Sequence, residues 1–441
     1  MIPQIIFTLL FLTGAGIFAF KIKQIRRNIF LGKPLEIKDN KAKRWKTMAK
    51  VAMGQSKMVV RPVAGFFHIL IYIGFVLINI EVLEIVIDGF TGEHRFFAPY
   101  LGGFYNFLIG FFEILAVLVI IACLVFLYRR NISSIKRFKM PEMKGWPKLD
   151  GNLILVIEVI LMGALLKMNA CDQILQLRGA DHYMVAGSFP ISKFLVPFFD
   201  GFETGTLITF ERIFWWAHIT GILIFLNYVP YSKHFHIMLA FPNTYYSNLK
   251  PKGQLDNMAA VKKEVDLMMG GDPFATPPEP AVDAGPPERF GVKDVTDLNW
   301  KNLLDAYSCT ECGRCTDNCP ANQTGKLLSP RKVMMDTRDR IEEVGKNLDK
   351  AGKPIEDGIS LLGNYITEEE LWACTTCNAC VDACPINIDP LDIIMNMRRY
   401  LIMEESKSPD SITSMFNNVE NNGAPWAFPA ADRGKWIDEL N

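Results

Sequence analysis

Five apolar stretches in the first half of the chain are long enough to span a membrane. A hydrocarbon layer about 30 Å thick is crossed by roughly 20 helical residues, and the apolar stretches run over 2–20, 62–87, 101–128, 151–171 and 205–230. Basic residues follow the first stretch instead of preceding it, which is the reverse of a cleavable signal peptide. We therefore predict five transmembrane helices, the first of them uncleaved.

The basic residues of the connecting segments predict how these helices are oriented. Residues 21–61 contain 13 Lys and Arg and residues 129–150 contain seven, whereas residues 88–100 contain one and residues 172–204 contain two. Cytoplasmic segments carry such an excess of positive charge. We predict that the protein lies in a bacterial cytoplasmic membrane with its N-terminus outside, and that everything after residue 230 is cytoplasmic.

The net charge of the chain conceals two different halves. The 441 residues include 47 Lys and Arg and 47 Asp and Glu, a balance of zero that excludes a polybasic nucleic-acid-binding protein. Residues 1–250 contain 27 basic and 15 acidic residues, whereas residues 251–441 contain 20 basic and 32 acidic residues. Opposite net charges on the two halves favour docking of the acidic half against the basic cytoplasmic loops.

Two cysteine motifs carry the strongest chemical signal in the acidic half. The first motif has the spacing C-x2-C-x2-C-x3-C-P and consists of Cys309, Cys312, Cys315, Cys319 and Pro320. The second motif repeats this spacing with Cys374, Cys377, Cys380, Cys384 and Pro385. This is the pattern of a protein with two [4Fe–4S] clusters, in which the fourth cysteine of each motif ligates the other cluster. The spacing predicts one cluster on Cys309, Cys312, Cys315 and Cys384, and a second on Cys374, Cys377, Cys380 and Cys319. Four-cysteine zinc sites, the alternative, usually combine two separated C-x2-C pairs.

The segments that follow the two motifs are internally repeated. Ser329-Pro330 and Asp389-Pro390 each combine a favourable N-cap with proline at the first helical position, which predicts a helix start. The two motifs are separated by the 54 residues between Cys319 and Cys374, which is a longer separation than in a compact bacterial ferredoxin. The region resembles the α-helical ferredoxin fold of the iron–sulfur subunits of heterodisulfide reductase and fumarate reductase.

Four of the six histidines lie in or beside predicted spans. His68 is in the second span and His218 in the fifth, with His234 and His236 just after it. An imidazole buried in lipid needs a partner, and haem iron held by histidines of two facing helices is one solution. A hydrogen bond to a neighbouring carbonyl is the alternative. His94 and His182, in external loops, are expected to be ordinary surface residues.

The membrane half resembles the b-type cytochrome subunit of respiratory nitrate reductase and the related membrane subunit of heterodisulfide reductase. In that family two histidines of the second span and two of the fifth bind two b haems. Here His218 and His236 have the separation of the fifth-span pair, but the second span supplies only His68, with Met58 and Ile78 ten residues to either side. The resemblance implies haem b on His68, His218 and His236, either one or two haems, Met58 being a candidate for the missing ligand, and menaquinone as the quinone.

Several ionisable residues fall within or at the ends of the predicted spans. They are Glu81, Glu84, Glu113, Glu158, Lys167, Glu211 and Arg212. One interpretation is proton transfer near a quinone. The other is pairing, or extension of the side chain towards the membrane interface, which we favour for Glu81, Glu84 and Lys167.

The chain divides into four predicted parts. They are a transmembrane b-type cytochrome domain (1–245), a proline-rich linker (246–292) with six prolines in 271–290, a two-cluster ferredoxin domain (293–405) and a partner-docking tail (406–441). The tail, with Asn421 to Trp426, Arg433 and Trp436, resembles the stretch that precedes a domain with paired cysteines in glycolate oxidase and heterodisulfide reductase iron–sulfur proteins. Because no adjacent cysteine pair occurs in this sequence, the resemblance implies a separate catalytic subunit.

The sequence as a whole predicts an all-α electron carrier: a five-helix transmembrane bundle followed by a cytoplasmic α-helical ferredoxin domain. Electrons are expected to pass between the quinone pool of the membrane, haem b, the two clusters and a soluble partner, either a paired-cysteine subunit or a flavoprotein. No residue pattern predicts catalysis beyond quinone turnover. The alternative is a haem-free membrane anchor whose ferredoxin domain docks a soluble redox partner.

Overall fold

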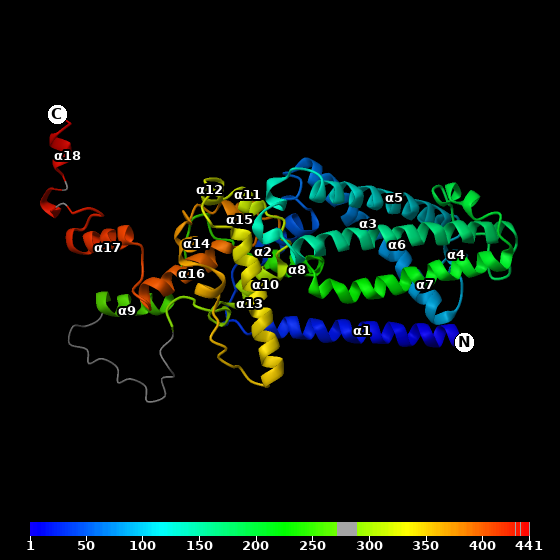
Figure 1. Cartoon of the computed structure of the whole chain (residues 1–441), viewed down its shortest axis with the longest axis horizontal. Coiled ribbons are helices and arrows are strands. Elements are labelled where there is room, and N and C mark those ends of the chain that lie inside the picture. Colours follow the sequence, from blue (N-terminus) through cyan, green and yellow to red (C-terminus); the bar gives the residue numbers. More distant parts are fainter. Residues whose placement is uncertain (271–288, 428, 433, 441) are drawn as a thin grey trace.

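The computed structural model describes residues 1–270, 289–427, 429–432 and 434–440, and its regular structure there is helical (Figure 1). Within these residues the only β-type pairings are two isolated bridges, Lys33 with Asn299 and Leu362 with Ile366. Residues 271–288 of the predicted linker, which contain the six prolines counted above, and Arg433 of the tail lie outside the described residues. The helical class predicted from the sequence is therefore confirmed.

Five long helices form a bundle and are apolar enough to cross a membrane. They are α1 (Ile2–Ile29), α3 (Pro62–Thr91), α5 (Gly103–Asn131), α6 (Trp146–Leu177) and α7 (Thr204–Tyr228). Helix α6 packs against α5 and α7, α3 packs against α5, and α1 packs against α3 and α7. Short helices α2 (Lys41–Met48), α4 (Ala98–Leu101) and α8 (His236–Tyr245) lie at the two ends of the bundle. These five helices indicate a membrane protein, as the hydropathy pattern predicts.

Helix α1 is longer than its apolar stretch. The predicted span ends at residue 20, but the helix continues to Ile29 because its polar end packs on the second half of the chain. Lys21 forms an ion pair with Glu342, Arg27 pairs with Asp349, and the Asn28 amide donates to the hydroxyl of Tyr307. Hydropathy therefore predicts the end of the apolar part of α1, whereas the end of the helix is set by the contacts of its polar part with the second half of the chain.

The second half gathers around three amphipathic helices at one end of the bundle (Figure 1). They are α10 (Trp300–Ser308), α13 (Pro330–Ala351) and α16 (Pro390–Met403). Ser329 and Asp389 cap α13 and α16, since their side chains accept hydrogen bonds from backbone N–H groups of the first turn. Both predicted helix starts are confirmed. Shorter helices complete this half: α9 (Ala259–Gly270), α11 (Arg314–Asp317), α12 (Pro320–Gln323), α14 (Glu368–Trp372), α15 (Ala379–Ala383), α17 (Asp410–Asn422) and α18 (Lys435–Asp438).

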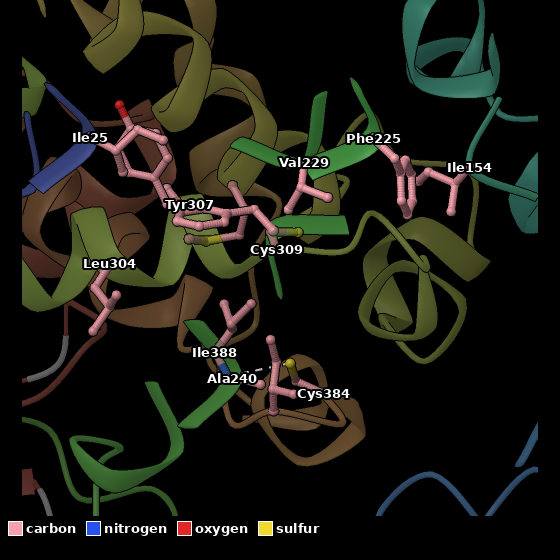
Figure 2. Close-up of a cluster of buried hydrophobic side chains, with 14 of the residues drawn as sticks. Ile25, Ile154, Phe225, Val229, Ala240, Leu304, Tyr307, Cys309, Cys384 and Ile388 are labelled. Carbon is pink, nitrogen blue, oxygen red and sulfur yellow. Dashed lines mark hydrogen bonds between the residues drawn. The ribbon is translucent and has the colours of Figure 1, made fainter. Parts of the chain in front are cut away.

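One apolar core runs from the bundle into the second half. Figure 2 shows Ile25 of α1 near Tyr307 of α10, and Val229, which follows α7, near Cys309 of the first cysteine motif. Charges cross the same junction, where Arg61 meets Asp317 at 2.5 Å and Arg331 meets Glu142 at 2.8 Å. Apolar burial and ion pairing together hold the cysteine motifs against one end of the bundle.

Candidate functional site

The structure brings Cys384 to the first cysteine motif. Cys309, Cys312 and Cys315 line one pocket with Cys384, which comes from the second motif, and the rest of the lining is mainly apolar. We call these four residues the proximal cysteine set. Their grouping agrees with the predicted exchange of the fourth cysteine, and their role as cluster ligands stays a prediction.

Cys319 is correspondingly placed with the second motif. Burial and the neighbouring thiolates of Cys319 and Cys377 raise the pKa of Cys374, and burial and the charges of Asp389, Cys374 and Cys319 raise the pKa of Cys380. We call Cys319, Cys374, Cys377 and Cys380 the distal cysteine set. Cys377 is exposed, whereas Cys319 and Cys380 are buried.

The two motifs adopt the same loop conformation. The second residue after the first cysteine has a positive φ in both, 55° at Glu311 and 56° at Thr376, and so has the fourth, 71° at Gly313 and 61° at Asn378. The two left-handed residues at matching positions give both loops the same turns between their first three cysteines. A Cβ on Gly313 would lie 2.4 Å from the Arg331 guanidinium, which explains the glycine there.

These loops provide backbone N–H groups that donate hydrogen bonds to the cysteine sulfur atoms, as well as the cysteines themselves. The backbone N–H of Thr376 donates to Cys374 Sγ at 3.4 Å, and that of Ile388 donates to Cys384 Sγ at 3.3 Å (Figure 2). Burial, the largest effect, raises the pKa of Cys309 to about 11 and that of Cys384 to about 12. Cluster ligation requires thiolates, so positive iron must supply the compensating charge, and N–H donors to sulfur stabilise the same ionised form.

The proximal set lies directly against the bundle. The guanidinium of Arg314 donates to the carbonyl of Lys57 at 2.8 Å and contacts Met58 Sδ at 3.4 Å, while Lys57 Nζ donates to the carbonyl of Cys384 at 3.2 Å. This segment leads straight into α3, which carries His68. Met58 is therefore engaged with the cysteine loops, so the structure does not favour it as a haem ligand.

His68 and His236 face each other across the same end of the bundle. Their ring centroids are 6.4 Å apart. The Nδ1–H of His236 donates to the carbonyl of Lys233 at 3.0 Å, which leaves Nε2 available, and Nδ1 of His68 is buried without a partner. A centroid separation of roughly 6 Å is that expected for two imidazoles that share one metal ion, so the distance agrees with the predicted haem, whose binding stays a prediction.

His234, which was not among the predicted ligands, belongs to the same group. Its ring lies 5.7 Å from that of His236 and 5.3 Å from Phe225, and its Nε2 is buried without a partner. Burial lowers the pKa of His234 to about 3 and also lowers that of His236, so both imidazoles are neutral, the form that binds metal. The two-residue spacing of these histidines was the available sequence signal.

His218 stands apart from this group. It is 1% exposed on α7, its Nδ1–H donates to the carbonyl of Leu161 at 2.9 Å, and its Nε2 has no partner. Among the described residues no ring contact joins it to another histidine. The structure thus supplies one facing pair, His68 and His236, and one single histidine with a free nitrogen.

The expectation for the two external-loop histidines holds only for His182, which is exposed. His94 is largely buried, since its side chain is 14% exposed, and its Nε2 lies 3.1 Å from Asp172 of α6. The surface assignment of His94 was wrong because the loop folds back onto a carboxylate 78 residues away.

Comparison with known proteins supports iron–sulfur chemistry. Residues 308–388 match the family model of the 4Fe-4S dicluster domain. The chain is 28% identical to the probable iron-sulfur-binding oxidoreductase FadF of Bacillus subtilis, over 96% of this chain and 59% of that protein. It is 28% identical to the EtfAB:quinone oxidoreductase of Syntrophomonas wolfei, over 88% of this chain and 53% of that protein. A probable membrane-anchored ferredoxin of Chromohalobacter salexigens is 32% identical over 34% of this chain and 25% of that protein.

The chain spans little more than half the length of the first two relatives. No solved structure matches it. The dicluster domain and the oxidoreductase relatives support iron–sulfur electron transfer, and five of the described helices are apolar enough to span a membrane.

Proposed function

We propose that this chain is the membrane-bound electron-transfer subunit of a quinone-linked oxidoreductase. The proximal and distal cysteine sets each bind a [4Fe–4S] cluster, and His68 and His236 bind haem b. Electrons pass between a quinone, with menaquinone implied by the resemblance, and a soluble catalytic partner. The observation that carries the proposal is the contact of the proximal set with the end of the bundle that holds the histidine pair. The distal set includes exposed Cys377, which offers access to a partner.

A short covalent and hydrogen-bonded route joins the histidines to the proximal loop. His236 donates to the backbone carbonyl of Lys233, and the ammonium group of that lysine pairs with Glu311, which lies between Cys309 and Cys312. Lys233 and Glu311 are 8% and 3% exposed. The protein thus orients the histidine ring and keeps water away from the junction, while haem and clusters, when bound, supply the one-electron chemistry.

The names of the relatives support the proposed quinone and the proposed soluble redox partner. One is described as an EtfAB:quinone oxidoreductase, which matches a quinone on one side and an electron-transfer flavoprotein on the other. A flavoprotein or a paired-cysteine subunit is therefore the proposed partner, docking beside the distal set. The distribution of basic residues supports a bacterial cytoplasmic membrane with the N-terminus outside and the cysteine motifs on the cytoplasmic side.

An absorption spectrum tests the haem. We expect the purified full-length protein, reduced with dithionite, to show the sharp α-band of haem b. Replacement of His68 or His236 by Ala removes one axial ligand and abolishes the band, while His182→Ala, at an exposed histidine, leaves it unchanged.

The haem-free anchor predicts a different spectrum. In that case the wild-type protein shows only the broad absorption of iron–sulfur clusters, and the histidine variants match it. Such a result would remove haem from the proposal and leave a ferredoxin tethered to the membrane.

A further inference from the structure

A hydrogen-bonded polar network lies within the bundle at the end remote from the cysteine motifs, where the N-terminus lies in Figure 1. Arg95 Nε donates to Asp172 at 2.7 Å, its Nη2 donates to Asn169 at 2.9 Å and its Nη1 donates to the hydroxyl of Tyr105 at 3.2 Å. That hydroxyl donates to Glu84 at 2.7 Å. We call these residues together with His94 the remote network.

The carboxyl groups at this end are inside the protein. Glu81 and Glu84 are 3% and 4% exposed, and Glu113 and Glu211 are fully buried. The expectation of pairing or extension to the interface holds for Glu84, which accepts hydrogen bonds from Tyr105 and from the backbone N–H of Phe97. It was wrong for Glu81, which is covered by neighbouring helices and has no hydrogen-bond partner. Lys167, by contrast, is exposed as expected.

Glu81 differs from the other buried carboxyl groups because it has no hydrogen-bond partner. Neither of its oxygens is bonded, although both are buried. Its side chain lines the same pocket as Glu84, Arg95, Asp172 and Trp215. A buried carboxylate without donors is costly, so the conformation seen here suits the protonated acid.

The surroundings of Glu81 contain more acids than bases. The ionisable groups that face or approach it are Glu84 and Asp88 of α3, His94 and Arg95 of the following loop, Tyr105 and Glu113 of α5, Asp172 of α6, and Glu211 and Arg212 of α7. Each of the other carboxyl groups accepts at least one hydrogen bond or ion pair. Glu81 is thus the carboxyl group that gains least from being ionised.

Glu81 also lies near His218, the buried histidine with a free nitrogen that the sequence resemblance names as a haem ligand in addition to the proposed pair of His68 and His236. On α7, Trp215 of the shared pocket precedes His218 by three residues, about one helical turn. On α3, Glu81 follows His68 by 13 residues, about 20 Å along the axis. The pocket of Glu81 therefore lies next to the turn of His218, well away from the cysteine sets.

We propose that Glu81 is a redox-linked proton-binding site that exchanges protons through the remote network. This inference rests on the proposed function, which brings electrons into the bundle. While an electron is in the bundle, Glu81 holds one proton and is the neutral acid, the form that the conformation seen here suits. When that electron leaves to the quinone or the partner, the proton is released. The added electron and the added proton cancel in charge, which removes the cost of a net charge in a low-dielectric interior.

The proposed route to the surface crosses the shared pocket from Glu81 to Asp172 and then follows the hydrogen bond between Asp172 and His94. His94 is hydrogen-bonded to Asp172 and its side chain is 14% exposed, so it joins the buried pocket to the water at this end of the molecule. The cysteine motifs lie at the opposite end of the bundle (Figure 1). Protons and electrons thus enter the bundle from opposite ends.

Redox-induced infrared difference spectroscopy on the purified full-length protein tests the site. We expect a band in the carboxylic-acid C=O stretching region that changes between oxidised and reduced protein and shifts in deuterated water. Glu81→Gln abolishes this band, and Glu81→Asp retains it at a shifted position. Glu93→Gln, at an exposed glutamate of the same end, leaves it unchanged.

The pH dependence of the midpoint potential of the bundle redox group gives a second measurement. Wild type and Glu93→Gln are expected to show a potential that falls as pH rises, and Glu81→Gln to lose most of that dependence. Retention of both the infrared band and the pH dependence in folded Glu81→Gln would overturn the proposal. Absence of a haem band in the wild-type visible spectrum would instead contradict the proposed function, while the infrared band on cluster reduction still decides the role of Glu81.

Discussion

Replacing Cys384 with Ser is expected to remove the cluster of the first motif and to spare that of the second. Cys384 lies in the pocket of Cys309, Cys312 and Cys315, although it is separated from Cys315 by 68 residues of sequence. A serine hydroxyl is a poor substitute for a thiolate on iron. The variant should therefore lose about half of its cluster iron, counted over two four-iron clusters.

Electron paramagnetic resonance of a small set of variants identifies the lost cluster. Cys384→Ser should lose the same signal as Cys312→Ser, and Cys319→Ser the same signal as Cys380→Ser. Cys171→Ser, at a buried cysteine of the bundle, should retain both signals. If Cys384→Ser instead matches Cys380→Ser, each motif holds its own cluster and the exchange of the fourth cysteine is wrong.

The cysteine sets could be grouped from sequence because their geometry is local and repeated. Spacing places three cysteines on one loop, and the proline after the fourth sends it elsewhere. The five helices were equally accessible, since lipid imposes length and hydropathy on each of them separately. Both predictions can be made from spacing and composition along the sequence, without knowledge of which distant residues come into contact.

The partner of His68 required such a contact. The resemblance names His68, His218 and His236 as haem ligands without deciding which of the other two pairs with His68. In the structure, short 3-10 turns over 229–235 bend the chain after α7, and this bend returns His236 to α3. The sequence shows a proline near this bend but not its direction.

The burial of Glu81 was not predicted for a related reason. A charge within an apolar stretch can extend to water, pair near the interface or be covered by neighbouring helices, and composition alone does not decide among these outcomes. Which of them occurs depends on the packing of α5 and α6 around α3, and for His94 on the return of a loop to Asp172. Long-range packing decides both, so these groups emerged only from the fold.

Replacing Glu311 with Ala is expected to be the most destabilising single change at the junction between bundle and cysteine loops. Glu311 is 3% exposed and pairs with Lys233 and with Arg338, the latter at 2.7 Å. Burial alone would raise its pKa, but the two cations outweigh burial and lower it, so the carboxylate is ionised. Its removal takes one ion pair from each cation and leaves Lys233 with Asp150 at 3.7 Å and Arg338 with Asp339 at 3.5 Å. Losing one partner of a buried pair costs up to about 3–5 kcal/mol.

The loss should be felt by the proximal cluster as well as by the fold. Glu311 occupies a left-handed position between Cys309 and Cys312, so a shift of its backbone displaces both sulfur atoms. Thermal unfolding followed by circular dichroism, together with iron content, measures both effects. Asp266→Asn breaks the exposed pair between Lys262 and Asp266 and should change stability by less than about 0.5 kcal/mol. Equal melting temperatures for Glu311→Ala and Asp266→Asn would show that the buried ion triad does not hold the junction together.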